Sequence, residues 1–174
     1  MPATQTVFGA GPIDARIMIV GEQPGDEEDK QGAPFVGPAG QLLMQILQVN
    51  GLPREQLYVT NAVKHFRFTL RGKKRIHQPP EARNIIACKP WLEMEIALVK
   101  PQVIVALGVT AGRALVHHGF TLKHDQHKDH HFNGIRVLPT WHPSAALRAM
   151  NDTARSEITA HIAATLQKAK AILR

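Results

Sequence analysis

Short aliphatic runs alternate with longer stretches of helical periodicity along this chain. Four of these runs predict strands, at Arg16–Val20, Leu57–Thr60, Val103–Leu107 and Ile135–Leu138. The first and third runs are almost continuously β-branched or aliphatic, which is typical of strands covered on both faces. The pattern therefore predicts a parallel sheet rather than a half-exposed antiparallel one.

Four helices are expected to follow these strands, at Ala39–Val49, Glu81–Val99, Ala111–His118 and about 153–173. Glycines at or just after the first and third segments, Gly51 and Gly119, are common helix-ending residues, and a kink is expected at Pro90. Strand and helix alternate four times. This order predicts an α/β fold, a three-layer sandwich around a central four-stranded parallel sheet.

The length of 174 residues fits one domain, taken here as residues 1–174. With 44% hydrophobic and 20% charged residues, the composition excludes a disordered chain. No apolar run approaches the roughly 20 residues that a membrane span needs, and the first residues lack the pattern of a signal peptide. We therefore expect a cytoplasmic, monomeric protein. A single cysteine, Cys88, excludes an internal disulfide and a metal site made of cysteines alone.

The charge balance points to nucleic acid as a partner. The chain has 21 Lys and Arg residues against 14 Asp and Glu residues, a formal charge of +7. No acidic residue lies between Glu55 and Glu81, a stretch that holds six cations. These are Lys64, Arg67, Arg71, Lys73, Lys74 and Arg75. A solvated basic loop without a partner is the alternative interpretation of this stretch.

Polar residues that could take part in catalysis or binding follow three of the predicted strands. In parallel sheets, ligands bind beyond the carboxyl ends of the strands. Glu22 follows the first strand, Asn61 the second and His142 the fourth. Singly, each has an ordinary structural explanation, as an exposed acid, a turn cap or a loop histidine. A carboxylate, an amide and an imidazole that converge on one rim beside a basic loop instead favour an active site.

Three segments carry a resemblance to a known family. They read GEQPGDEEDKQGAPFVGPAGQLL at 21–43, VTNAVKHF at 59–66 and WHPSAALR at 141–148. Together they resemble the signature segments of the family 4 uracil-DNA glycosylases. Gln23 stands where ordinary members carry alanine, and a basic loop at about 66–80, containing KKRIH at 73–77, is inserted after the second strand. Both features resemble the UdgX branch of that family, and imply its uracil-DNA glycosylase-like fold from about Ala3 to the last helix.

The resemblance implies an activity and a set of residue roles. Members of that branch excise uracil from DNA and stay covalently joined to the exposed deoxyribose through a histidine, which matches His77. The resemblance makes Glu22 the carboxylate near the sugar and His142 the hydrogen-bond donor to the uracil oxygen. Gln23 stands where an acid could have activated water. The implied partner is uracil-containing DNA, with single strands preferred.

The remaining implied residues bind the base and the DNA. Phe35 resembles the stacking ring and Asn61 the base reader, with Gly21 beside them in the uracil pocket. An amide offers one donor and one acceptor, which match O4 and N3–H of uracil, whereas cytosine presents the reversed pair. Residues expected at the DNA backbone are Lys73, Lys74, Arg75, Ser144 and Arg148.

The sequence differs from the family in the ligands of the iron–sulfur cluster that family members carry. Two cluster ligands match His65 and Cys88, but the two cysteines that the family carries before the position of Ala3 have no counterpart in this sequence. We therefore expect neither a 4Fe-4S cluster nor any other cofactor or metal. Six histidines between His117 and His131 lack the spacing of a metal site and predict a solvated loop or hairpin.

Two other functions stay open at this point. In the first, the chain is a conventional glycosylase with multiple turnover, and His77 contacts only a phosphate. In the second, it is a DNA-binding module that keeps the pocket without the chemistry.

Overall fold

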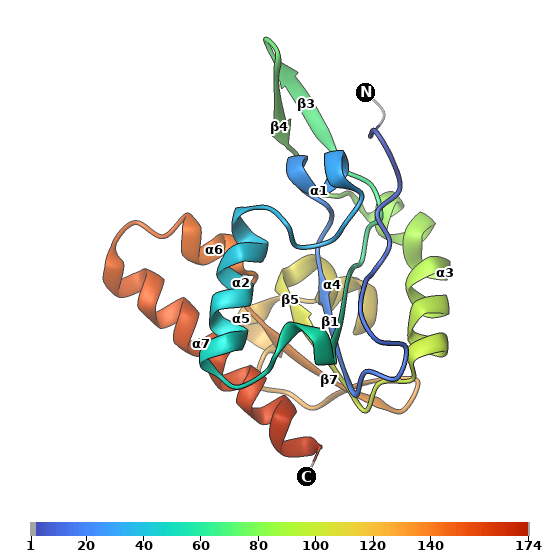
Figure 1. The fold of residues 1–174 in the computed structure, drawn as a ribbon, viewed down its shortest axis with the longest axis vertical. Coiled ribbons are helices and arrows are strands. Elements are labelled where there is room, and N and C mark those ends of the chain that lie inside the picture. The colour runs from blue at the N-terminus through green and yellow to red at the C-terminus, as the bar shows by residue number, and fades with distance from the viewer. Residues whose placement is uncertain (1–2, 174) are drawn as a thin grey trace.

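A five-stranded sheet forms the centre of the molecule (Figure 1). The structure is a computed structural model that describes residues 3–173. The strands lie in the order β2-β1-β5-β7-β6. Their bounds are Ile17–Gly21 for β1, Leu57–Asn61 for β2, Val103–Leu107 for β5, His130–Phe132 for β6 and Ile135–Thr140 for β7. The four predicted strands form the parallel part of the sheet, which confirms the α/β fold.

The prediction of four strands was wrong by one. The fifth strand, β6, pairs antiparallel with β7 at the edge of the sheet. Its residues are His-His-Phe, and this run is too short and too polar to show strand periodicity. An antiparallel edge strand on an otherwise parallel sheet is a common arrangement.

Helices cover both faces of the sheet. One core cluster joins Ile17 and Ile19 of β1 to α2 (Pro38–Val49) and α7 (Asp152–Ile172). The second joins Met18 and Val20 to α3 (Ala82–Val99) and α4 (Gly108–Leu115). Neighbouring residues of a strand point to opposite faces, so β1 contributes to both clusters. The three-layer sandwich is thereby confirmed.

Short elements connect the strand ends to these helices. They are α1 (Asp26–Gln31), the 3-10 helix η1 (Arg54–Gln56), α5 (Leu122–Asp125) and α6 (Pro143–Leu147). The first and last of these follow β1 and β7, where the predicted site residues lie. No helix within residues 3–173 is long and apolar enough to cross a membrane.

The inserted basic segment is a hairpin and not an irregular loop. Strands β3 (Phe68–Arg71) and β4 (Lys74–His77) pair antiparallel, with Phe68 opposite His77 and Arg71 opposite Lys74. We call residues 68–77 the basic hairpin. Gly72 at its turn has a positive φ of 61°, which glycine adopts without steric cost. The basic hairpin projects from the body of the molecule beside α1 (Figure 1).

Candidate active site

The carboxyl ends of the parallel strands open into a cavity of about 970 Å³. Most of the predicted site residues line it. They are Glu22, Gln23, Phe35, Asn61, His77, His142, Ser144 and Arg148. These residues come from segments that are far apart in the sequence, and the parallel sheet brings them to one rim.

Glu22 and His77 form the most direct contact in the cavity. Glu22 follows β1, and its Oε1 atom lies 2.9 Å from Nε2 of His77 at the end of β4. The second carboxylate oxygen, Oε2, accepts a hydrogen bond of 2.9 Å from the Thr110 hydroxyl. Burial raises the pKa of the Glu22 carboxyl, but the bonds from His77 and Thr110 outweigh it, so the net pKa lies below the ordinary value. Glu22 is therefore a carboxylate at neutral pH.

His142 is held in one neutral tautomer. It caps the amino end of α6, and its Nδ1 atom accepts a hydrogen bond of 3.1 Å from the backbone N–H of Ser144. Burial lowers the pKa of His142 to about 4, although Glu22 acts in the opposite direction. A neutral imidazole whose Nδ1 accepts a bond carries its proton on Nε2. His142 thus has a donor N–H left for a ligand in the cavity.

Phe35 and Asn61 face each other across Gly21. A Cβ atom at Gly21 would lie 2.5 Å from Oδ1 of Asn61 and 2.7 Å from Cζ of Phe35, so a larger residue would push both away. The Phe35 ring stacks with the His142 ring at 6.4 Å between centroids. Phe35 also has a positive φ of 56°, uncommon for a bulky residue and frequent at functional sites. Gly21 permits this close arrangement without lining the cavity itself.

A buried lysine supports Asn61 from behind. Lys64 has no exposed surface, and its Nζ atom donates to the Asn61 carbonyl at 2.7 Å, to Thr60 Oγ1 at 2.7 Å and to Glu95 Oε2 at 2.5 Å. Burial lowers the pKa of this amine, and Glu95 opposes that shift. Lys64 was counted in the basic stretch of the sequence. The structure instead places it beneath Asn61 and away from the surface.

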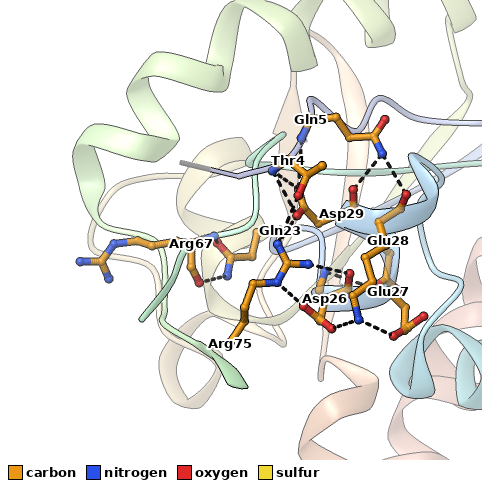
Figure 2. Close-up of polar contacts among 11 residues, drawn as sticks. Thr4, Gln5, Gln23, Asp26, Glu27, Glu28, Asp29, Arg67 and Arg75 are labelled. Atoms are coloured by element: carbon orange, nitrogen blue, oxygen red, sulfur yellow. Dashed lines mark hydrogen bonds and ion pairs between the residues drawn. The ribbon is translucent and has the colours of Figure 1, made fainter. Parts of the chain in front are cut away.

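The role of Gln23 differs from the expected one. Its amide is buried and makes three hydrogen bonds with the main chain on both sides of the basic hairpin. Nε2 donates to the carbonyls of Arg67 and Gln78. Oε1 accepts from the N–H of Arg67, and Figure 2 shows Gln23 beside Arg67. Gln23 therefore anchors the base of the hairpin that carries His77.

Arg75 also differs from its prediction as a phosphate contact. Its guanidinium pairs with Asp26 Oδ1 and Asp29 Oδ2, both at 2.5 Å (Figure 2). It also lies over the rings of Phe66 and Phe68, at 5.3 and 5.0 Å from their centroids. The arginine thus fastens the basic hairpin to α1, and its charge is already compensated.

The other predicted DNA contacts have mixed positions. Lys73 and Lys74 are exposed at the turn of the basic hairpin, outside the cavity lining. Arg148 is exposed at the cavity wall, whereas Ser144 contacts Nδ1 of His142 at 2.8 Å. Sequence reasoning did not find Thr110 as a site residue. Its position in the first turn after β5 was the available signal, since that strand end also opens on the cavity.

His65 and Cys88, which match two of the family's cluster ligands, contact other groups in this structure. The sulfur of Cys88 is buried and accepts a bond from the N–H of Lys64 at 3.4 Å, while Nε2 of His65 contacts the Thr6 hydroxyl at 2.8 Å. Within residues 3–173, no three His, Cys, Asp or Glu side chains are grouped as metal ligands. A cluster of this kind needs four ligands.

In the histidine-rich stretch, His117 and His118 follow α4, His124 lies in α5, and His130 and His131 lie in β6. His130 is buried and contacts the Asp125 carbonyl at 2.8 Å through Nε2. Its neighbours His127 and His131 are exposed. The end of the stretch thus forms one arm of the β6–β7 hairpin at the edge of the sheet, in line with the expected loop or hairpin.

Comparisons with known proteins agree with this geometry. Residues 8–167 match the family model of the uracil DNA glycosylase superfamily. A type-4 uracil-DNA glycosylase of Thermotoga maritima is 36% identical, over 98% of this chain and 84% of that protein. One from Sulfurisphaera tokodaii is 37% identical, over 83% of this chain and 66% of its own length. A type-5 enzyme of Pyrobaculum aerophilum is 31% identical, over 77% and 63%. The chain therefore belongs to the uracil-DNA glycosylase superfamily.

Proposed function

We propose that this protein excises uracil from DNA, preferably single-stranded, and that His77 then captures the exposed deoxyribose covalently. The contact that carries the proposal is the one between Nε2 of His77 and the Glu22 carboxylate, 2.9 Å apart in the cavity. In this proposal, the imidazole of His77 is the nucleophile, Glu22 is its base, and both face the sugar of a flipped nucleotide.

The cavity supplies what recognition of uracil requires. An enzyme that acts on the glycosidic bond moves the nucleotide out of the base stack into a pocket. Phe35 offers a ring for stacking, and the Asn61 side chain lines the cavity. Its amide can donate to O4 of uracil and accept from N3–H. Cytosine would leave both buried groups without partners, at a cost of about 1–3 kcal/mol each.

Cleavage of the glycosidic bond separates charge, and the site contains one group suited to each of the two charges that form. The departing uracil carries the bonding electron pair and becomes an anion, while the sugar becomes a cation resembling an oxocarbenium ion. We propose that the Nε2–H of neutral His142 donates to the uracil oxygen. The Glu22 carboxylate would stabilise the sugar cation.

Capture then competes with attack by water. Nε2 of His77 forms a bond with C1′ of the sugar cation, and the proton on Nε2 passes to the Glu22 carboxylate, so charge is conserved. A nucleophile fixed beside its target reaches an effective molarity of about 10⁵ M, well above that of water. Gln23 offers no carboxylate to activate water, because its side chain is an amide, and that amide is bound to the main chain of Arg67 and Gln78. Both features favour the adduct.

The substitution His77→Ser tests the proposal. The wild-type chain should form a one-to-one complex with a uracil-containing oligonucleotide that survives boiling in detergent, without turnover. The serine variant should lose this complex but still release uracil, since Glu22, Asn61 and His142 remain. Denaturing electrophoresis and a uracil-release assay measure the two events separately.

His161→Ser is the matched control, because His161 is an exposed histidine of α7 outside the cavity lining. It should behave as the wild type. A wild-type chain that released uracil repeatedly without an adduct would overturn capture and identify a conventional glycosylase. Mass spectrometry that located the sugar on another residue would overturn the assignment to His77.

A further inference from the structure

Thr110 is a buried polar residue that none of the steps above uses. It is the third residue of α4, and 7% of it is exposed. Its hydroxyl donates to Oε2 of Glu22 at 2.9 Å, while Oε1 of the same carboxylate contacts His77. Glu22 is thus held between two elements, the first turn of α4 and the end of β4.

This second contact restricts how the carboxylate can turn. The terminal torsion of a glutamate has a broad, two-fold preference, so one hydrogen bond leaves the carboxylate considerable freedom. A donor at each oxygen defines its plane. The contact with Thr110 therefore keeps Oε1 directed at the imidazole of His77.

We propose that Thr110 is a positioning residue that fixes the Glu22 carboxylate on His77 and so determines how cleaved substrate divides between capture and hydrolysis. The proposal rests on the proposed function of the site. Without the hydroxyl, Glu22 can rotate away from His77 and accept a bond from water instead. The Glu22 carboxylate then acts as a base for water and no longer for His77.

The contact also affects the ionisation of Glu22. The hydrogen bond from Thr110 is among the causes that hold the pKa of this carboxyl below its usual value. Loss of the bond should raise that pKa. Uracil release requires the carboxylate, so its decline at acidic pH should begin at a higher pH. This effect does not depend on whether an adduct forms.

Thr110→Val is the test, because valine keeps the shape of threonine and removes the hydroxyl. We expect the ratio of adduct to free abasic product to fall about tenfold, and the acidic limb of the uracil-release profile to move to higher pH. Thr110→Ser retains the donor and should restore both. Thr159→Val is the matched control, since the Thr159 hydroxyl bonds only to the Arg155 carbonyl of its own helix.

The outcomes separate this proposal from the one it rests on. If the wild type formed no adduct, the proposal of covalent capture would be wrong. The acidic limb of the pH profile of uracil release would then decide the role of Thr110. The proposal for Thr110 would be overturned if the valine variant kept the acidic limb of the wild-type uracil-release profile and, wherever an adduct forms, the wild-type ratio of adduct to abasic product. A serine variant as defective as valine would also overturn it, because that result would indicate a packing role for the methyl group. Circular dichroism of both variants checks that each is folded.

Discussion

A single backbone N–H decides which proton His142 can offer. The amide of Ser144 donates to Nδ1, and burial holds the pKa of His142 at about 4. The imidazole is therefore neutral throughout the range from about pH 5 upward, and its Nε2–H can donate without first losing or gaining a proton. Titration of this residue should not limit the reaction near neutral pH.

Replacing His142 with alanine should slow uracil release by roughly a hundredfold, equivalent to about 3 kcal/mol of barrier. The reason is that a preorganised donor to the uracil anion is lost. DNA affinity should change little, because the donor acts mainly when charge develops. Single-turnover release and a binding titration measure the two quantities.

Ser144→Ala serves as the control for His142, since it keeps the backbone N–H that fixes the tautomer and removes only the hydroxyl at 2.8 Å. It should cost far less than His142→Ala. A His142→Ala variant that released uracil at the wild-type rate would contradict the donor role.

The sequence predicted which residues lie at the strand ends, but it did not predict the residues that hold them in place. Glu22, Asn61 and His142 could be predicted because the end of a parallel strand has a fixed place in the fold. The supports are contacts between residues far apart in the chain. Thr110 lies 88 residues from Glu22, and Glu95 lies 31 residues from Lys64. Charge and residue type alone do not reveal such pairs.

Among the elements, the basic hairpin was the least predictable. Its strands have four residues each, and the segment was read as a loop that presents cations to DNA. Arg75 illustrates why that interpretation was incomplete. A cation in an acid-free stretch can still meet acids from elsewhere, and here Asp26 and Asp29 of α1 lie 49 and 46 residues away.

The substitution Arg75→Met should loosen the basic hairpin and slow adduct formation about tenfold or more. It removes two ion-paired hydrogen bonds, each typically worth about 1.5–3 kcal/mol when the partner is charged, while the alkyl part still covers Phe66 and Phe68. Uracil release should change less, because Asn61 and His142 do not depend on the hairpin. Time courses of both products provide the comparison.

Arg71→Met is the matched control, since Arg71 is an exposed arginine of the same hairpin. It should leave the rate of adduct formation unchanged at saturating DNA. Equal losses in the two variants would mean that charge on the hairpin matters and anchoring to α1 does not.

For the whole molecule, the positive charge available to DNA is smaller than the sequence implies. Of the six cations in the acid-free stretch, Lys64 and Arg75 are paired with carboxylates, and Arg67 pairs with Glu81. Arg71, Lys73 and Lys74 remain exposed on the basic hairpin. The two lysines, nearest its turn, are the candidates that we test for phosphate contacts.

The double variant Lys73→Ala/Lys74→Ala should therefore weaken the salt dependence of single-strand binding. Each phosphate contact contributes about 0.7 to the slope of log K against log salt, so the slope should become shallower by about 1.4. Adding Arg75→Ala should change the slope little further. Lys168→Ala, an exposed lysine of α7, is the control. An unchanged slope in the double variant would show that the hairpin turn faces away from DNA.

The amino-terminal segment connects the two supports of the site. The backbone N–H groups of Thr4 and Gln5 donate to Asp29, the partner of Arg75, and the N–H of Gly9 donates to Glu95, the partner of Lys64. Residues before the first strand thus brace both the ion pairs that anchor the basic hairpin and the buried Lys64–Glu95 pair beneath Asn61. A truncation or a bulky fusion at this end would disturb chemistry that takes place elsewhere in the chain, so affinity tags belong at the opposite terminus.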